Sequence, residues 1–321
     1  MSRNILSLLF GSSSTMRAAV KIIYVMGLGR SGSTILDVVL GNHPALRSVG
    51  QFSNFVRVAW MNSRPCSCGH ASHDCPFWSH VRQRWHQHLG SHSEREYEAA
   101  RQSYERISRG PFNVPVSRLG AERFRFYLDS TVALYQSVYE ACEGKTLVDS
   151  SKIPLRALHL SRVDTIDLRI IHNIRDARAA AFSWNKPSKR RPRGVTHTAV
   201  DWMASNLLSE WVLQRARETK SLRLRNEDFV NDPVGALHSI GDLIDEDMDP
   251  VITQLLENRP MRAIHLATGN RVIWEKQIRL RPDMEWRSAM SDRDKRKVWA
   301  ITWPLMVRYG YPRTARSGDG P

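Results

Sequence analysis

Short apolar runs alternate along the chain with segments whose apolar residues recur at helical spacing. The predicted strands are 21–26, 145–149, 167–174 and 221–225. The helices predicted to follow them are 34–42, 154–161, 176–184 and 232–244. A continuous apolar run is typical of a strand buried on both faces. Strands that alternate with helices predict an α/β fold with a central parallel β-sheet flanked by helices.

Local end signals support this reading, and they leave room for helical insertions. Pro154 and Pro233 stand at the first positions of two predicted helices, and Asp232 is a good N-cap. The segments 78–109 and 118–141 are helical in pattern and are predicted to be inserted between strands. We expect a leader at 1–20, one domain over 21–311 and a disordered tail at 312–321.

Composition adds a strong positive charge to an otherwise ordinary chain. The 321 residues are 41% hydrophobic and 25% charged, with a formal net charge of +15. Such a chain attracts anions, which include nucleotides, acidic substrates and anionic surfaces. No apolar run approaches the roughly 20 residues of a membrane span. We therefore expect a soluble, cytoplasmic protein for which peripheral membrane contact and oligomeric state stay open.

The stretch "GLGRSGST" at 27–34 is the first candidate for chemistry. It has both glycines and the hydroxyl of the phosphate-binding loop G-x-x-x-x-G-K-[ST], but Ser33 replaces the lysine and Arg30 appears earlier. It lies between a predicted strand and a predicted helix, so its backbone amides would face an anion at a helix N-terminus. The alternative is a tight turn that needs glycine only for steric reasons.

A second candidate is "HNIRDARAAAFSWNK" at 172–186. Arg175 ends an apolar strand, and Ser183 follows eight residues later, about two helical turns on. An arginine and a hydroxyl that converge at a strand end suit a phosphate monoester. The alternative is that Arg175 pairs with Asp176 or another acid.

Together these two motifs resemble the sulfotransferases that use 3′-phosphoadenosine 5′-phosphosulfate (PAPS). The resemblance extends from about 21 to 311 and is closest to bacterial relatives of tyrosylprotein and carbohydrate sulfotransferases. Further patterns of that superfamily recur here as "CSCG…CPFW" (66–78), "VDSSK" (148–152), "GN" before an arginine (269–271) and "RYGY" (308–311).

The resemblance implies roles for individual residues. The 5′-phosphosulfate would be held by the loop, and the 3′-phosphate by Arg175 and Ser183. Lys152 would be catalytic by supporting the leaving oxygen, and Asn270 and Arg271 would close over the nucleotide. The implied loop residues are Gly29, Arg30, Ser31, Gly32, Ser33 and Thr34.

The implied reaction moves a sulfuryl group to an acceptor hydroxyl and leaves adenosine 3′,5′-bisphosphate. A sulfuryl group carries less charge than a phosphoryl group, so we expect no requirement for a metal. The acceptor class stays open among small molecules, phenols, glycans, lipids and peptides.

The chain departs from the family pattern at two positions. Tyrosylprotein-type and many bacterial relatives carry "GE" after the first helix, and that glutamate takes the acceptor proton. Here "SVGQF" has Gln51, which can orient a hydroxyl but cannot deprotonate it. His43, His70 and His73 are alternative candidates for the base. "RNEDF" has Asn226 where relatives often have a tyrosine near the adenine, so the adenine must pack elsewhere.

Three of the four cysteines lie close together in sequence, and Cys142 stands apart. Cys66, Cys68 and Cys75, with His70 and His73, can be drawn as a zinc knuckle, but the C-x-C spacing is poor for one. Free thiols or a local disulfide are the favoured interpretation.

Two rival functions stay open beside the sulfotransferase. A degenerate P-loop kinase or nucleotide hydrolase would need a magnesium-binding acid, for which Asp149 is the candidate. A non-catalytic nucleotide-binding protein is kept open by Gln51. The basic run 186–194 contains no aromatic residue, which argues against nucleic acid, and is either a solvated loop or a lid over the cofactor.

Overall fold

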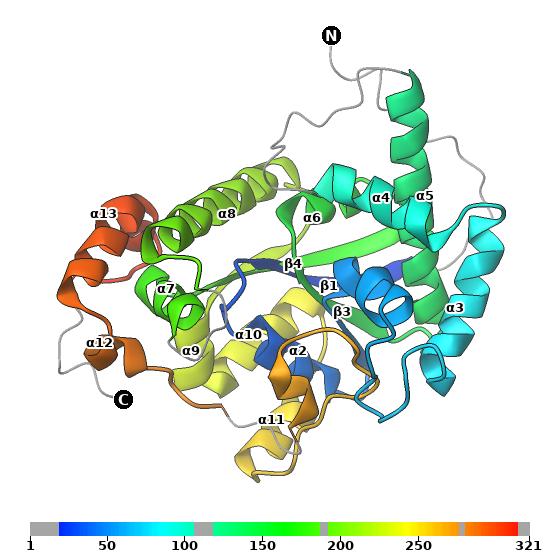
Figure 1. Ribbon diagram of the computed structural model, residues 1–321. Helices are drawn as coiled ribbons and strands as arrows, with labels where there is room; N and C mark the ends of the chain where they lie inside the picture. Colours follow the sequence, from blue (N-terminus) through cyan, green and yellow to red (C-terminus); the bar gives the residue numbers. More distant parts are fainter. Residues whose placement is uncertain (1–18, 106–117, 187–191, 276–279, 314–321) are drawn as a thin grey trace.

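The structure is a computed structural model that describes residues 19–105, 118–186, 192–275 and 280–313. The central feature is a sheet of five parallel strands in the order β2-β3-β1-β4-β5 (Figure 1). The expected leader and tail lie almost wholly outside the described residues. The strands are β1 (Val20–Gly27), β2 (Leu46–Gly50), β3 (Thr146–Lys152), β4 (Ile166–Ile174) and β5 (Ser221–Arg225).

Helices cover both faces of this sheet, as the alternating pattern predicted. The helices that follow strands are α2 (Ser33–Gly41), α6 (Pro154–Leu160), α7 (Ala177–Asn185), α9 (Asn226–Asn231) and α10 (Pro233–Ile244). The helices between β2 and β3 are α3 (Pro76–Leu89), α4 (Glu94–Glu105) and α5 (Arg118–Ala141), which confirms helical insertions. The remaining helices are α8 (Val195–Arg215), α11 (Asp249–Leu256), α12 (Glu285–Ala289) and α13 (Asp292–Arg308). Three short helical turns complete the described elements: η1 (Phe52–Asn54), η2 (Val56–Met61) and η4 (Arg271–Trp274).

The central strand β1 shows why the sheet is buried on both faces. Ile22 and Tyr24 point into one apolar cluster, together with residues of α5, α6 and α8. Ile23 and Val25 point into a second cluster formed with α2, α10 and α11. All four side chains are fully buried. Because successive side chains of a strand alternate between faces, a continuous apolar run is what such a strand requires. Figure 1 shows the two helical layers on opposite faces of the sheet.

Strand β2 and helix α8 were not predicted, for different reasons. The β2 sequence "LRSVG" is short and carries Arg47, so it lacks the apolar run of the other strands. Helix α8 buries polar side chains, among them Ser205, Asn206 and Ser209. They bond within the structure: Ser209 donates to the Ser205 carbonyl, and Asn206 to the Trp202 carbonyl. A helix with buried polar residues has no clean apolar stripe to detect.

The predicted caps are confirmed where the sequence was most specific. The Asp232 side chain accepts from the Gly235 amide at 2.9 Å, and Pro233 is the first residue of α10. Among the described residues, no helix combines the length and apolar character that crossing a membrane requires.

Candidate active site

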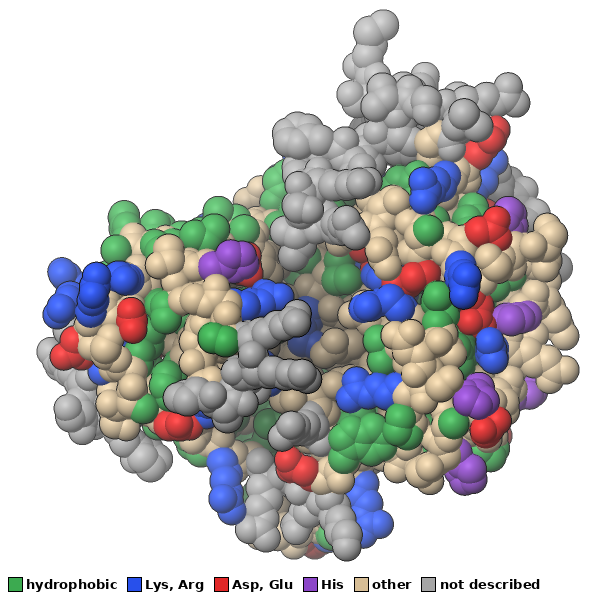
Figure 2. All heavy atoms as spheres, in the orientation of Figure 1, with side chains coloured by type: hydrophobic (Ala, Val, Ile, Leu, Met, Phe, Trp, Pro, Cys, Tyr) green, Lys and Arg blue, Asp and Glu red, His purple; other side chains and the backbone are tan. Residues whose placement is uncertain are grey.

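A cleft of about 390 Å³ opens at the carboxyl ends of β1, β3 and β4. Ligands of α/β sheets bind at this edge. Figure 2 shows that this face of the molecule is hollowed in its middle, with Lys and Arg side chains around the hollow. The cleft brings together residues from six separate segments of the chain. It is lined by Gly29, Arg30, Gly32, Ser33, Thr34, Ile35, Gln51, Lys152, Arg175, Ser183, Trp184, Gly269, Asn270, Val272 and Asp283.

Ten of the twelve residues that the sequence assigned to PAPS binding or to catalysis therefore share one cleft. Ser31 is buried directly beneath it, with 2% of its surface exposed. The side chain of Arg271, at the start of η4, lies outside what the structure describes.

The loop after β1 has the backbone of an anion-binding turn. Gly32 is the N-cap of α2 in the left-handed region, and Arg30 also has a positive φ of 73°. No side chain caps this helix, and its first turn has no acid. The amides at the helix start therefore face the cleft without a side-chain acceptor, and the helix dipole favours an anion there.

Asn226 explains why position 32 must be glycine. A Cβ added at Gly32 would lie 1.8 Å from the Asn226 Oδ1, in addition to its φ of +79°. Asn226 therefore packs against the loop backbone and does not line the cleft.

Asn173 ties the loop to the sheet, and sequence reasoning did not identify it. It lies near the end of β4, and its Nδ2 donates to the Ser31 carbonyl at 2.8 Å. A Cβ at Gly27 would approach the Asn173 carbonyl to 2.3 Å, so the two strand ends meet closely. The loop is held on the sheet by this contact as well as by its own backbone.

Arg175 lies immediately after β4 and is only 8% exposed. One guanidinium nitrogen donates to the Arg30 carbonyl at 2.8 Å, and another to the Asp283 carboxylate at 2.9 Å. Asp176 takes a different partner: it caps α7 and pairs with Arg178. Arg175 therefore does pair with an acid, but with one that lies 108 positions away and lines the same cleft.

Lys152 is the last residue of β3 rather than a residue beyond it, and its φ is 70°. A lysine in this conformation stores strain of about 1 kcal/mol or more, which is common at functional sites. Its Nζ donates to the Ser150 carbonyl at 2.7 Å. Burial lowers the pKa of Lys152 to about 8, partly offset by the charges of Asp37 and Asp149.

Asp37, on α2, is the acid whose charge most raises the pKa of Lys152, and it was missed in the sequence. It is 1% exposed, and burial raises its pKa to about 8. The positive charge of Lys152 acts in the opposite direction. In the sequence Asp37 sits in the apolar helix "TILDVVL", where no signal distinguishes it from a capping or surface acid.

The Asp149 carboxylate links the turn after Gln51 to the end of β3, the strand that ends at Lys152. Its Oδ1 accepts from the amides of Ser151 at 2.8 Å and Phe52 at 3.3 Å, and its Oδ2 accepts from the Tyr135 hydroxyl. Phe52 begins η1 directly after Gln51, so this carboxylate positions Gln51 beside the end of β3. Asp149 is 0% exposed and does not line the cleft, so its own carboxylate is not placed to bind a magnesium ion there.

None of the three histidines considered as a base lines the cleft. His43 is buried, and its two ring nitrogens contact the Asp247 carbonyl at 2.7 Å and the Ala45 amide at 3.2 Å. His73 pairs with Asp74, and His70 lies beside Cys68. His43 is therefore a satisfied structural residue, and the other two belong to the cysteine-rich loop.

Trp184 forms one wall of the cleft. The guanidinium carbon of Arg30 lies 5.1 Å from a Trp184 ring centroid, and that of Arg193 lies 4.4 Å away. The indole Nε1 donates to the Gly29 carbonyl at 3.2 Å. Arg193 belongs to the basic run 186–194, most of which lies outside the described residues, so one end of that run contacts the cleft wall.

A glycine loop at a helix start, with three cations from three strand ends, makes a cleft suited to binding anionic groups. Residues 23–250 match the model of the sulfotransferase family. The chain belongs to this family.

Solved structures with a similar fold are also sulfotransferase domains. The domain from the curacin biosynthetic pathway is 16% identical, with a TM-score of 0.52 over 92% of this chain and 99% of that one. The domain from the olefin synthase of Synechococcus PCC 7002 is 20% identical, with a TM-score of 0.49 over 94% of this chain and 99% of that one. A comparison with curated proteins gave no significant match.

Proposed function

We propose that this sulfotransferase takes its sulfuryl group from PAPS and transfers it to an acceptor hydroxyl. The observation that carries the proposal is that Arg30, Lys152 and Arg175 line one cleft at the start of α2. Among the described lining residues, Asp283 is the one acid. PAPS carries two separated anionic groups, a phosphosulfate and a 3′-phosphate, and these cations would neutralise both of them.

The donor set supports a 3′-phosphate at Arg175. A guanidinium nitrogen of Arg175 already donates to a carboxylate within the cleft, that of Asp283. Ser183 lines the same cleft and offers a hydroxyl donor. A phosphate oxygen would accept from Arg175 in the way the Asp283 carboxylate does, because Arg forks bind both anions.

When bound, PAPS would supply an activated sulfuryl group whose bond to the 5′-phosphate oxygen breaks as the acceptor oxygen bonds to sulfur; adenosine 3′,5′-bisphosphate leaves, and the proton of an acidic acceptor hydroxyl is lost to solvent. Arg30 and the amides of Ser31 to Thr34 bind the phosphosulfate oxygens. The Lys152 ammonium group would donate a hydrogen bond to the leaving oxygen, where negative charge grows in the transition state. Arg175 and Ser183 hold the nucleotide in register.

Gln51 faces the acceptor in this proposal and orients its hydroxyl. Among the part of the chain that the structure describes, the residues lining the cleft include no histidine and no carboxylate other than that of Asp283, which pairs with Arg175. Acceptors with an acidic hydroxyl need no base, whereas alcohols do. Small molecules, phenols, glycans, lipids and peptides are the classes to be compared.

Labelled sulfate transfer from PAPS to a panel of these acceptors tests the proposal, with adenosine 3′,5′-bisphosphate as the product to be measured. The expected result is transfer that is unchanged when magnesium is added or omitted. Transfer of a phosphoryl group from ATP that depends on magnesium would instead favour the kinase. Tight nucleotide binding without turnover of any acceptor would favour the non-catalytic binding protein.

A further inference from the structure

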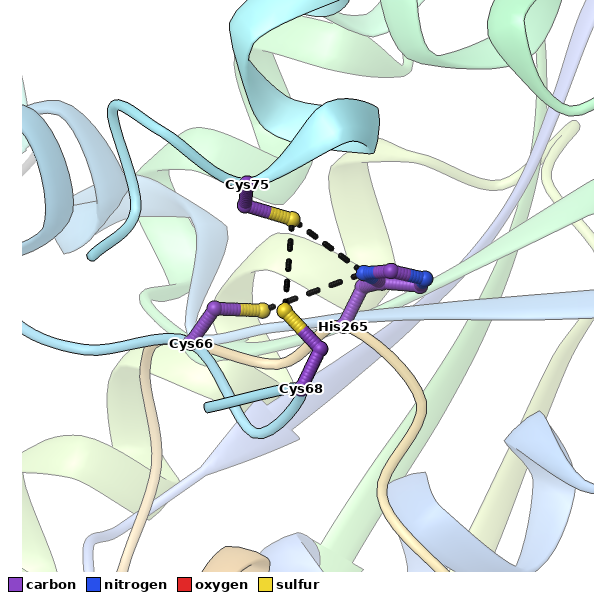
Figure 3. A group of neighbouring side chains, drawn as sticks. All are labelled: Cys66, Cys68, Cys75 and His265. Carbon is purple, nitrogen blue, oxygen red and sulfur yellow. Dashed lines mark hydrogen bonds between the residues drawn. The ribbon is translucent and has the colours of Figure 1, made fainter. Parts of the chain in front are cut away.

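The cysteine-rich loop contains a side chain that the sequence did not associate with it. His265 comes from a segment 190 positions after Cys75, and its Nδ1 lies 3.2 Å from the Cys75 Sγ and 4.0 Å from the Cys66 Sγ. The Cys68 Sγ lies 3.6 Å from the Cys75 Sγ. Figure 3 shows the three sulfur atoms and this ring nitrogen pointing toward one another.

These distances are close to those between the ligand atoms of a tetrahedral metal site. Zinc bonds of about 2.3 Å to sulfur and about 2.0 Å to nitrogen put the ligand atoms of a tetrahedron about 3.5 to 3.8 Å apart. All four ligand atoms lie within 4.8 Å of one another, and no pair of the sulfur atoms is bonded. Three cysteines and one histidine form a closed set with no open position, which is typical of structural zinc.

Burial raises the pKa of the Cys66 and Cys75 thiols, and nearby backbone amides act in the opposite direction: those of Phe77 and Trp78, at the start of α3, on Cys75, and that of Cys68 on Cys66. Three thiolates, a neutral imidazole and Zn²⁺ carry a net charge of −1. Arg47 supplies a compensating charge: it is close enough to interact with Cys66 and Cys75, and lies 4.3 Å from the Phe77 ring.

Hydrogen bonds outside the ligand set hold the cysteine-rich loop and the segment around His265 together. The Ser67 amide donates to the Leu266 carbonyl at 2.7 Å, and the Leu266 amide donates to the Ser67 hydroxyl at 2.9 Å. The Trp78 indole donates to the His265 carbonyl at 2.6 Å. Such outer contacts orient metal ligands in known sites.

We infer that Cys66, Cys68, Cys75 and His265 bind one Zn²⁺ ion, with release of the three thiol protons. The ion ties the segment that follows α11 to the loop before α3. That segment continues into Thr268, whose carbonyl would lie 2.6 Å from a Cβ on Gly50, next to Gln51. It then supplies Gly269 and Asn270 to the cleft. The site thereby holds one wall of the cleft in place.

Metal analysis of the full chain, purified with a reductant and without chelators, tests this inference. We expect about one zinc ion per chain, and tetrahedral cobalt–thiolate absorption after exchange with Co²⁺. His265→Ala and Cys75→Ser should lose the bound zinc. The matched controls, His70→Ala and Cys142→Ser, should keep it, because His70 lies beside only one of the sulfur atoms and Cys142 lies outside the cluster.

Three results would overturn the inference, and the first two do not depend on variants that fold. The first is a wild-type chain that stays free of zinc after incubation with Zn²⁺ and reductant. The second is a Cys68–Cys75 disulfide in freshly prepared protein, seen by mass of the unreduced peptides. The third is zinc that survives His265→Ala and is lost with His70→Ala, while circular dichroism shows both variants folded.

Discussion

Replacing Arg175 with alanine should weaken the binding of adenosine 3′,5′-bisphosphate through the 3′-phosphate alone. In the structure the guanidinium is fixed by the Arg30 carbonyl and paired with Asp283. Loss of a charge-assisted hydrogen bond costs roughly 1.5 to 3 kcal/mol. Since 1.4 kcal/mol is a factor of ten, the dissociation constant should rise roughly 10- to 150-fold.

Asp283 makes this prediction sharper. Its carboxylate occupies donors of Arg175 that the 3′-phosphate would use, so Asp283→Asn should tighten binding of the bisphosphate. The gain should be modest and should shrink with salt, because the Asp283 side chain is 38% exposed. In Arg175→Ala the carboxylate is left unpaired near the phosphate, so adding Asp283→Asn should recover part of the loss. A double-mutant cycle measures this coupling.

Isothermal titration calorimetry at constant ionic strength is the assay, with adenosine 5′-phosphate as the matched ligand that lacks the 3′-phosphate. Its binding should barely change in any of the three variants. Equal weakening of both ligands by Arg175→Ala would show that Arg175 does not bind the 3′-phosphate, and the assignment would be abandoned.

Four further predictions concern the chemistry. Lys152→Ala should lower kcat by roughly two to three decades with little change in nucleotide affinity, as for a lost oxyanion donor; a normal kcat in steady-state assays would remove Lys152 from the mechanism. Because the protonated form of Lys152 is the active one and its pKa is about 8, kcat/KM should fall as the pH rises through about 8. The pKa of Asp37 is also about 8, so Asp37 carries a partial negative charge where Lys152 titrates; Asp37→Asn removes it, so the same limb of the pH profile should move slightly to lower pH, and an unmoved limb would contradict the coupling. Gln51→Glu should raise the rate with alcohol acceptors by supplying a base, and should leave the rate with acidic phenols unchanged or lower; a rate that rises equally for both classes would show that Gln51 does not face the acceptor hydroxyl.

Much of the site could be predicted from the sequence because its chemistry is local. The loop at 27–34 carries its glycines, its arginine and its helix start within eight residues, and the spacing of Arg175 and Ser183 lies within one strand–helix unit. The parallel sheet follows from apolar runs that the buried strands require. In each case neighbouring residues in the chain produce the signal, so no knowledge of distant contacts is needed.

Tertiary structure alone decided which distant residues meet at the cleft and around the cysteines. Asp283 pairs with Arg175, the charge of Asp37 acts on Lys152, and His265 lies beside Cys75. The order of the strands and the path of the C-terminal segment bring these residues together. The pKa values of Lys152 and Asp37 also depend on burial, which a helix pattern does not specify for a single acid. A sequence encodes local spacing directly, whereas pairings between segments depend on how the whole chain packs, and these residues carry no local mark of their partners.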